Sequence, residues 1–544
     1  MRRDRSFMTL KVLSLLNTTL AQTVYQPCPL LQAYYPAPIL DKNSSAIRSF
    51  AQEFTSIFDS LIQSDGSDDF GAITPNTTSF SIVLFSGDDD AGEDPIIFEY
   101  HHTATLLETA ENVTAQTVFP VGTLTQLFTV YSWLVLTTDG SWSSPVTDFL
   151  PELKQVSLNA SEYDIDMGVE WNSITVGSLA SHMSGLVRNS DACNVVEACD
   201  KQTFLEAISS KTPYFLADTT PIVSNAAFQL LAYAIESRSG LSFSNYMRQS
   251  ILEPSKMTQS GLLDADAQIF GDGLNRTATG EPAALSLYTS TGDLAQAGRA
   301  MLSSRLLPPA QTRRWLQPAA DTSNLRNAAG RPWEIYHAGE RANSSILDVY
   351  TKTGSVGRYS SYFGLAPDFD AGFAMLAHDT ETDAPDLNVY ADVVSLALLT
   401  LEELAARQMA ARFAGEYAAV GQDGEKSYTV LNVTDEGPGL VVLELVVDGT
   451  DVRSEAAARA GIDDVKNLDM RLYSSNVASG NLRQFVAVFQ DRSAPVDMDT
   501  PTCITWMAVG ALQGVPVRYI FEVDDNEVAV GMRIPDKQAR LEKN

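Results

Sequence analysis

The sequence predicts an α+β fold, in which an antiparallel sheet is flanked by helices and joined to a mostly helical region, followed by a small all-β domain. Two strand-like runs, 79–86 and 95–104, are separated by a short acidic turn, which is typical of a hairpin. Strand-like runs return at 346–354 and 360–378, after a long helical and loop-rich stretch, and we expect them to rejoin the same sheet. Beyond residue 411 only short β runs with Gly and Asp turns follow, which indicates a separate sandwich or small barrel.

The helices expected in the first domain have local signals of their own. Residues 46–62 carry apolar side chains at helical spacing. A helix that begins near residue 121 has few polar positions, so we expect it to lie buried against the sheet. The run 225–240 reads as an amphipathic helix ended by glycine, and a long helix over about 387–411 completes the domain.

The length of 544 residues is too great for one compact core and suits two or three domains. We expect a signal peptide over 1–21, a principal domain over 22–411 and an all-β C-terminal domain over 412–544. The sequence does not indicate an oligomeric state.

The charge balance excludes some partners. The chain has 37 basic and 68 acidic residues, which gives a net charge of −31. Such a surface repels phosphate backbones and anionic membranes, so we expect neither nucleic acid nor membrane as a partner. No apolar run reaches the ~18 residues that span a bilayer. A small molecule is the expected partner.

The N-terminus predicts a secreted protein. It reads MRRDRSFMTLKVLSLLNTTLAQT, in which basic residues precede a short apolar run and small residues, as in a signal peptide. The alternative is an ordinary cytosolic N-terminus. Secretion is favoured by seven sites with the glycosylation pattern N-x-S/T beyond the expected signal peptide, at Asn43, Asn76, Asn112, Asn159, Asn275, Asn343 and Asn432.

The four cysteines fit the same compartment. Cys193 and Cys199 flank a short segment and could close a small disulfide loop, whereas Cys28 and Cys503 could join the two ends of the chain. The histidines and cysteines have no metal-binding spacing, so we expect no metal and no cofactor.

Several stretches occur in an order that is typical of one protein family. They are TVFPVGTLTQLFTV (117–130), PVTDFLPEL (145–153), SITVGSLASHMSGL (173–186), VSNAAFQLLAYAIE (223–236), LEPSKM (252–257), TSTGDLAQAGRAML (289–302) and KTGSVGRYSSYFGLAPD (352–368). This order resembles the β-lactamase and penicillin-binding-protein superfamily, most of all its class C and esterase branch. Within that branch it is similar to secreted β-lactamase-like proteins of fungi that carry an extra C-terminal β domain. The resemblance covers roughly residues 25 to 410.

The resemblance implies a β-lactamase/transpeptidase-like fold and a position for each catalytic group. In that family a serine opens an S-x-x-K helix, the lysine one turn later takes its proton, and the tyrosine of a Y-x-N loop relays protons. A K-T-G strand supplies electrostatic stabilisation and an edge for substrate. The corresponding positions of this sequence are Thr123 for the serine, Gln126 for the lysine, Val223 for the tyrosine, Asn225 for the loop asparagine, and Lys352, Thr353 and Gly354 for K-T-G.

The departures from the family pattern remove the usual bases. A hydroxyl near pKa ~15 is a poor nucleophile without a base, and neither Gln126 nor Val223 can accept a proton near neutral pH. Lys352 could deprotonate Thr123 only with a lowered pKa. Loss of the base alone costs on the order of 10⁴ to 10⁶ in rate in intact triads. Turnover through an acyl-enzyme is therefore not expected.

The same residues also have structural interpretations. Thr123 could cap its helix, and Gln126 could fill a former pocket. Asn225 could hold its own loop, because loop asparagines often satisfy backbone groups. His182 resembles a family position that supports the fold, which predicts a buried histidine with satisfied hydrogen bonds. A lysine beside a cleft needs an anionic or polar partner, so Lys352 has the stronger functional claim.

Three hypotheses follow. In the first, the cleft binds a carbonyl-bearing small molecule and promotes a non-covalent cyclisation, isomerisation or elimination, as in small-molecule tailoring. Its candidate catalytic residues are Thr123 and Lys352, and its candidate substrate-binding residues are Gln126, Asn225, Thr353 and Gly354. The second hypothesis is a non-catalytic secreted binding protein or a decaying paralogue, that is, a pseudoenzyme. The third is residual ester or amide hydrolysis through Thr123.

Overall fold

The computed structural model describes residues 25, 27–32, 34–89, 92–107, 111–155, 168–195, 199–264, 266–338, 346–382, 384–420, 425–494 and 505–544. The expected signal peptide over 1–21 lies outside these residues. The described residues divide into two compact units, one from residues 37–338 and 347–404, and one from residues 405–544 together with Ile346 and the described residues up to Pro36. The long helix α11 (Asn388–Phe413) begins in the first unit and ends in the second.

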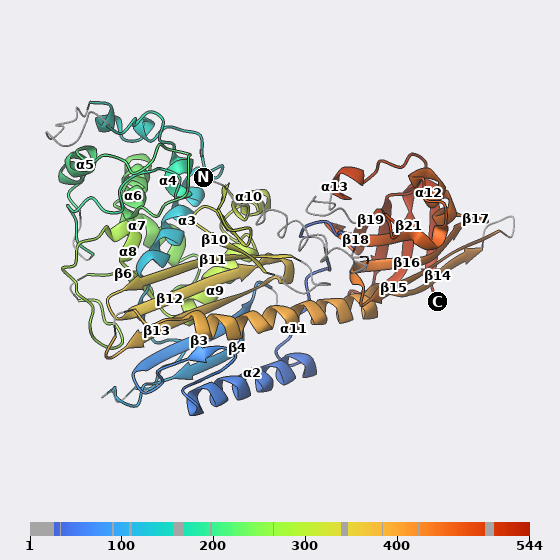
Figure 1. Ribbon diagram of the computed structural model, residues 1–544, viewed down its shortest axis with the longest axis horizontal. Helices are drawn as coiled ribbons and strands as arrows, with labels where there is room; N and C mark the ends of the chain where they lie inside the picture. The colour runs from blue at the N-terminus through green and yellow to red at the C-terminus, as the bar shows by residue number, and fades with distance from the viewer. Residues whose placement is uncertain are drawn as a thin grey trace, which may run out of the picture. The chain divides into compact units, whose positions relative to one another are not determined.

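An antiparallel sheet forms the centre of the first unit (Figure 1). Its strands lie in the order β4 (Ile96–His102), β3 (Thr78–Ser86), β13 (Ala371–Asp379), β12 (Tyr359–Ala366), β11 (Leu347–Val356), β10 (Glu334–Ala338), β9 (Asn327–Ala329) and β8 (Ala320–Asp321). The N-terminal hairpin thus pairs with strands from nearly 300 positions later, because β13 returns beside β3 with Ala374 opposite Val83.

The sheet is covered on both faces. Alternate residues of a strand point to opposite faces, and β3 is buried along its whole length. Val83 and Phe85 pack into one hydrophobic core, whereas Ile82 and Leu84 pack into another. The second core also contains residues of α2 (Ser45–Gln63) and α11, which lie together on that face in Figure 1. We call this the rear face of the sheet.

The front face carries the helical region. It includes α3 (Thr125–Thr137), α4 (Val176–Ala180), α5 (Lys201–Ser209), α6 (Asn225–Ser239), α7 (Phe243–Met247), α8 (Pro282–Leu285), α9 (Thr291–Leu302) and α10 (Pro309–Trp315). Apart from its last turn, α3 is buried almost throughout, so an amphipathic stripe is not needed to place it. The expected helix near 121 is correct in kind, but its first turn, Gly122–Leu124, is a 3₁₀ turn and the α-helix begins at Thr125.

The other elements predicted for the first unit are confirmed within a few residues. They are α2, α6 with Gly240 as its left-handed C-cap, the hairpin β3–β4, the strands β11, β12 and β13, and α11. The strands β8, β9 and β10, which extend the sheet beyond β11, were not predicted from the sequence. They have two, three and five residues, which is too short for a period-two pattern to be recognised.

The second unit contains an antiparallel β-barrel, which decides between the two β architectures that the sequence allowed. Its strand order is β15 (Lys426–Thr434), β14 (Gly415–Val420), β22 (Ala539–Lys543), β21 (Ala529–Ile534), β20 (Arg518–Val523), β19 (Leu482–Asp491), β18 (Leu468–Ser479) and β16 (Gly437–Val447). The pairing of β15 with β16 closes the ring. A ninth, two-residue strand, β17 (Thr450–Asp451), pairs with β16 at the rim of this ring. The barrel core includes Phe413, Phe485 and Phe521.

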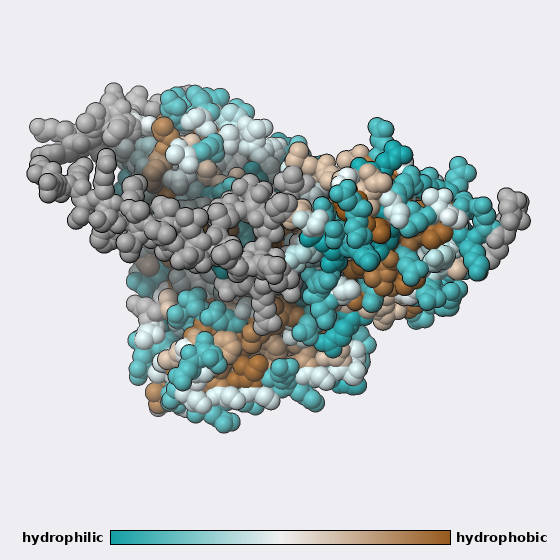
Figure 2. All heavy atoms as spheres, turned by 45° about the vertical axis from the view of Figure 1, so that its right-hand side comes forward, coloured by the Kyte–Doolittle hydropathy of each residue, from teal (hydrophilic) through white to brown (hydrophobic). Residues whose placement is uncertain are grey.

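On the face that Figure 2 shows, hydrophilic side chains alternate with gathered patches of hydrophobic side chains. In the part of the chain that the structure describes, no helix is long and apolar enough to cross a membrane.

Candidate functional site

The site is built where the start of α3 meets β11. Gly122 has a positive φ of 54°, and a side chain there would collide with the backbone of Ser355. A side chain at Gly354 would collide with Val121 and Leu124 in the same way. The two glycines therefore let the turn before α3 lie directly against the K-T-G strand, which brings Thr123 to Thr353.

Thr123 uses its hydroxyl as a donor. Its Oγ1 donates to the carbonyl oxygen of Thr353 at 3.1 Å, and the side chain is half-buried. The hydroxyl does not cap α3, which has no side-chain cap, so the capping interpretation is wrong. A peptide carbonyl cannot accept a proton at neutral pH. The contact orients the hydroxyl without activating it.

Gln126 occupies the lysine position and is fully buried. Its Nε2 donates to Asn225 Oδ1 at 3.0 Å, so the structure brings together two of the predicted substrate-binding residues. Its Oε1 is buried and has no partner among the described residues. An unpaired buried polar atom costs about 1–3 kcal/mol, which is unusual for a residue that only fills space.

Asn225 connects Gln126 to the neighbouring loop. Its Nδ2 donates to Asn189 Oδ1 at 2.8 Å, and its backbone N–H donates to the carbonyl of Arg188. The half-buried Val223 contributes no polar atom to this loop. The loop is positioned by backbone bonds and by the N-cap Ser224, so its shape does not depend on the missing tyrosine.

Lys352 is almost completely buried and has a partner inside the chain. Its Nζ donates to Glu334 Oε1 at 2.5 Å and to the carbonyl oxygen of Thr353 at 2.9 Å. Glu334 Oε2 accepts from the backbone N–H of Thr353 at 2.9 Å and from its hydroxyl at 2.8 Å. One carboxylate thus binds the lysine and the threonine of the K-T-G strand together.

The electrostatics leave only weak bases at this point. Burial raises the pKa of Glu334, but the charge of Lys352 and the hydrogen bonds from Lys352 and Thr353 outweigh it and hold the pKa below the usual range. Burial, aided by the charge of Lys352, lowers the pKa of His182 to about 4. The imidazole is therefore neutral near pH 7. Its Nε2 lies 3.3 Å from the Pro332 carbonyl, whereas its Nδ1 has no partner among the described residues. Only one of the two ring nitrogens therefore has the hydrogen bond that was expected of this buried histidine.

The structure thus places the predicted residues in two layers. Thr123 and Thr353 are at least partly exposed and form the outer layer, whereas Gln126, Asn225, Lys352 and Gly354 are buried. Glu334 was not predicted from the sequence, because it lies on the unpredicted strand β10. The one sequence signal for Glu334 was a carboxylate in the segment RPWEIYHA, where proline interrupts the alternation of apolar and polar residues that marks a strand.

The predicted Cys193–Cys199 disulfide is present. Cys503 lies outside the described residues, so its pairing with Cys28 stays a prediction. Among the described residues, no three His, Cys, Asp or Glu side chains are placed to hold a metal ion.

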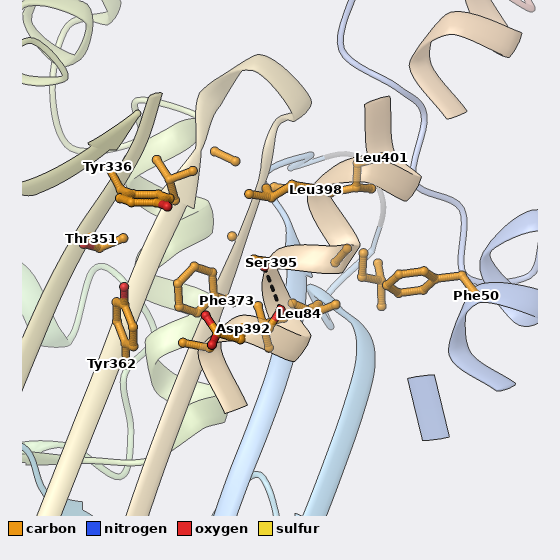
Figure 3. Close-up of a pocket in the computed structure, with 18 of the residues that line it drawn as sticks. Phe50, Leu84, Tyr336, Thr351, Tyr362, Phe373, Asp392, Ser395, Leu398 and Leu401 are labelled. Carbon is orange, nitrogen blue, oxygen red and sulfur yellow. Dashed lines mark hydrogen bonds between the residues drawn. The ribbon is translucent and has the colours of Figure 1, made fainter. Parts of the chain in front are cut away.

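A separate cavity of about 270 Å³ lies on the rear face, between the sheet and the helices α2 and α11 (Figure 3). Tyr336, Thr351 and Tyr362 line it from the strands, Leu398 lines it from α11 and Phe50 from α2. Thr351 precedes Lys352 on β11 and points to the opposite face. Neither Thr123 nor Lys352 lines this cavity, so it is not part of the candidate site.

Comparisons with known proteins agree with this architecture. The sequence matches the Beta-lactamase family over residues 93–396, and a second family, described as "Beta-lactamase-like-like, C-terminal domain", over residues 405–544. A beta-lactamase-like protein of Arthroderma benhamiae is 23% identical over 538 residues, which cover 84% of this chain and 86% of that protein. A protein of Phoma sp. named "Probable hydrolase M10" is 21% identical over 471 residues, which cover 77% of this chain and 72% of that protein.

Among solved structures, a class C β-lactamase mutant matches with a TM-score of 0.49 at 17% identity, covering 65% of this chain and 98% of that one. The family match spans residues 93–396, more than half of the sequence, and the barrel has a family match of its own. The chain therefore belongs to the β-lactamase family and carries the C-terminal domain of β-lactamase-like proteins.

Proposed function

We propose that this protein binds a carbonyl-bearing small molecule at Thr123 and Thr353 and promotes a non-covalent step, such as a cyclisation, isomerisation or elimination, without forming an acyl-enzyme. The observation that carries the proposal is the bond from Thr123 Oγ1 to the Thr353 carbonyl at 3.1 Å. It leaves the hydroxyl oriented and half-exposed, and the groups around it are hydrogen-bond donors and weak bases.

The outer layer can supply what such a step needs. Hydroxyl hydrogens rotate to suit a partner, so Thr123 can donate to a carbonyl oxygen when it gives up the Thr353 carbonyl, and Thr353 can do so when it gives up Glu334. Donors held in place around an oxygen that gains charge lower the barrier without any nucleophile. Binding also holds the reacting groups of one molecule close together, which accounts for much of the rate in a cyclisation.

The test is a thermal-shift screen of lactones, esters, enones and β-diketones against the full chain. A bound ligand raises the melting temperature, because it stabilises only the folded state. We expect a hit that is lost in Thr123→Val, which removes the hydroxyl and keeps the shape. Thr55→Val is the matched control, because Thr55 Oγ1 bonds within α2 to Ala51 and lies on an exposed helix surface. No hit, or a hit that Thr123→Val retains, would contradict the proposal.

A second candidate is hydrolysis through Thr123, because two fungal relatives carry the names "Probable hydrolase M10" and "Probable hydrolase clz13". One contact favours it: Lys352 Nζ and Thr123 Oγ1 both donate to the Thr353 carbonyl, so the ammonium and the hydroxyl lie near each other. Glu334 opposes it, since its carboxylate already binds the Lys352 ammonium at 2.5 Å. Covalent labelling of Thr123 by a fluorophosphonate would establish this candidate.

The non-catalytic alternative is favoured by the bonds that occupy Lys352 and Thr353. Their donors already meet Glu334, so a ligand at this site would compete with an internal acceptor. This alternative predicts that ligands bind and leave the cleft chemically unchanged. Mass spectrometry of each screening hit after incubation with the protein distinguishes a non-catalytic binding protein from a catalyst.

We also propose that the protein is secreted. The five glycosylation-pattern asparagines among the described residues all have exposed side chains, namely Asn43, Asn76, Asn112, Asn275 and Asn432. Exposure is required of an acceptor site for glycan. The proposal predicts that the protein from a eukaryotic host loses mass on treatment with an N-glycosidase. No loss of mass would count against it.

A further inference from the structure

Glu281 is a buried carboxyl group next to the candidate site, and nothing in the proposed chemistry uses it. It lies immediately before α8 and is 1% exposed. Its Oε1 accepts from the backbone N–H of Ser190 at 2.6 Å. The following segment is tied to α3, the helix of the candidate site, because Thr129 Oγ1 donates to the Ala283 carbonyl at 2.7 Å.

A continuous row of side-chain amides joins Glu281 to Gln126. The Asn189 atom that accepts from Asn225 Nδ2 at 2.8 Å also lies 3.0 Å from Glu281 Oε2 and 3.1 Å from the Arg188 carbonyl. Asn225 Oδ1 in turn accepts from Gln126 Nε2 at 3.0 Å. The row ends at the second polar atom of Gln126, which is buried and has no partner among the described residues.

This row has two directions, and only the one that turns the Asn189 nitrogen toward Glu281 also gives a donor to the Arg188 carbonyl, 3.1 Å away. If Glu281 is ionised, it can only accept, so Asn189 must turn its N–H₂ group toward Oε2. Asn225 must then face Asn189 with its oxygen, since two N–H₂ groups cannot bond to each other. Its nitrogen now faces Gln126, which must present its oxygen to Asn225 and leave its N–H₂ group at the unpartnered end.

A protonated Glu281 reverses each step. Its Oε2–H group donates to the oxygen of Asn189, and Asn189 also accepts from Asn225 Nδ2. Asn225 Oδ1 accepts from Gln126 Nε2, so Gln126 Oε1 is left at the unpartnered end. Each amide turn exchanges the positions of nitrogen and oxygen and moves no backbone atom.

We propose that Glu281 is a positioning residue, whose proton decides through Asn189 and Asn225 whether Gln126 presents amide hydrogens or an amide oxygen to the site. Gln126 lies one helical turn after Thr123, so the two side chains share a face of the helix. If the site binds a carbonyl compound as proposed above, the ionised state places amide hydrogens, and the protonated state an amide oxygen, in the buried position one helical turn after Thr123. The same chain would thus bind such a ligand better on the alkaline side of the Glu281 titration.

The surroundings of Glu281 raise its pKa above that of an ordinary glutamate. Burial raises its pKa, the hydrogen bonds from Ser190 lower it in part, and the charge of Asp191 raises it further. From α6, Tyr233 donates its hydroxyl to the Cys199 carbonyl; its pKa is raised chiefly by burial and slightly by the charge of Glu281. Glu281 therefore loses its proton at a pH closer to neutral than an exposed glutamate does.

Neutron diffraction tests the inference directly, because it locates deuterium and so distinguishes an amide nitrogen from an oxygen. Deuterium-exchanged crystals of the full chain would be measured in mildly acidic and in mildly alkaline buffer. We expect deuterium on the unpartnered Gln126 atom in alkaline crystals, and on the atom that faces Asn225 in acidic crystals. Glu281→Gln is the matched variant. The amide oxygen that this substitution introduces can accept from Ser190 and its N–H₂ group can donate to Asn189, so the variant should keep the acidic arrangement in both buffers.

Three outcomes overturn the inference: one orientation of Gln126 in both wild-type crystals, a switch in the direction opposite to that predicted, or a switch that persists in Glu281→Gln. The wild-type pair is decisive even if the variant does not fold. The readout needs no ligand. A switch without ligand binding at Thr123 would contradict only the proposed function, whereas ligand binding with fixed amides would contradict only the role of Glu281.

Discussion

Lys352 and Glu334 form an ion pair at the end of β10, with Nζ 2.5 Å from Oε1, and Glu334 also binds Thr353. The lysine side chain is 2% exposed and the glutamate side chain 38% exposed. The positive charge that the family resemblance assigns to the substrate is therefore neutralised within the chain. The Lys352 ammonium can therefore meet a ligand only if its bond to Glu334 is given up.

The first prediction concerns this pair. Glu334→Gln leaves the buried Lys352 ammonium with a neutral partner and should lower the free energy of unfolding by about 2 kcal/mol, because the exposed side of Glu334 lets water compensate in part. Chemical denaturation of the full chain measures the change. Glu334→Gln with Lys352→Met removes both charges and should recover part of the loss. If the single variant is as stable as the wild type, the pair does not support the site.

The second prediction is the acid dependence of the same pair. Since the pKa of Glu334 is lowered in the folded protein, its contribution is present above the unfolded pKa and is lost as the pH falls through the folded pKa. The stability gap between wild type and Glu334→Gln should be widest at neutral pH and close in acid. Denaturation over an acid pH series measures it, and a gap that is independent of pH would rule out the electrostatic explanation.

The third prediction concerns Glu281, whose shift has the opposite sign. A raised folded pKa gives a contribution that is complete below the unfolded value of about 4.5 and is lost as the pH rises through the folded pKa. The wild type should therefore lose stability relative to Glu281→Gln as the pH rises from acid toward neutral. Parallel pH series of the two proteins test this. A constant difference between them would show that Glu281 does not titrate in this range.

The fourth prediction concerns the Cys193–Cys199 disulfide, which borders the Glu281 loop. The Gly280 N–H donates to the Cys193 carbonyl, and the sequence separation of the cysteines is 6. Replacement of both cysteines by alanine should cost about 2 kcal/mol, because a short closed loop removes little entropy from the unfolded chain. Denaturation measures the loss. Reduction of the wild type should give a similar value, and a much smaller loss would show that the loop is held by its hydrogen bonds.

Much of the fold was predictable because its elements have local signals. The apolar spacing of α2, the terminal glycine of α6 and the β-rich runs of β3 and β11 each follow from a few neighbouring residues. The strand β10 lacks such a signal, since it is short and follows Arg331-Pro332. Its existence depends on pairing with β11, which is a tertiary effect.

The candidate site was predictable only where a motif marks it. Thr123, Gln126, Asn225 and Lys352 occupy motif positions, and the structure brings them to one place. Glu334 reaches Lys352 because the register of β10 sets it opposite Thr351. The register between two strands cannot be predicted from a few neighbouring residues. The row through Asn189 to Glu281 likewise joins residues from separate loops. The roles of all these residues remain predictions.

The central claim is that Thr123, Gln126 and Val223 occupy the catalytic positions of the fold and that the natural chain performs no covalent chemistry there. It is tested by intact mass after exposure to a fluorophosphonate, for the wild type and for a variant that carries Thr123→Ser, Gln126→Lys and Val223→Tyr. The variant restores nucleophile, base and proton relay on an unchanged backbone. We predict an unmodified wild type and a variant that gains one phosphonyl group at residue 123. A wild type labelled at Thr123 would contradict the account and make this protein a threonine hydrolase.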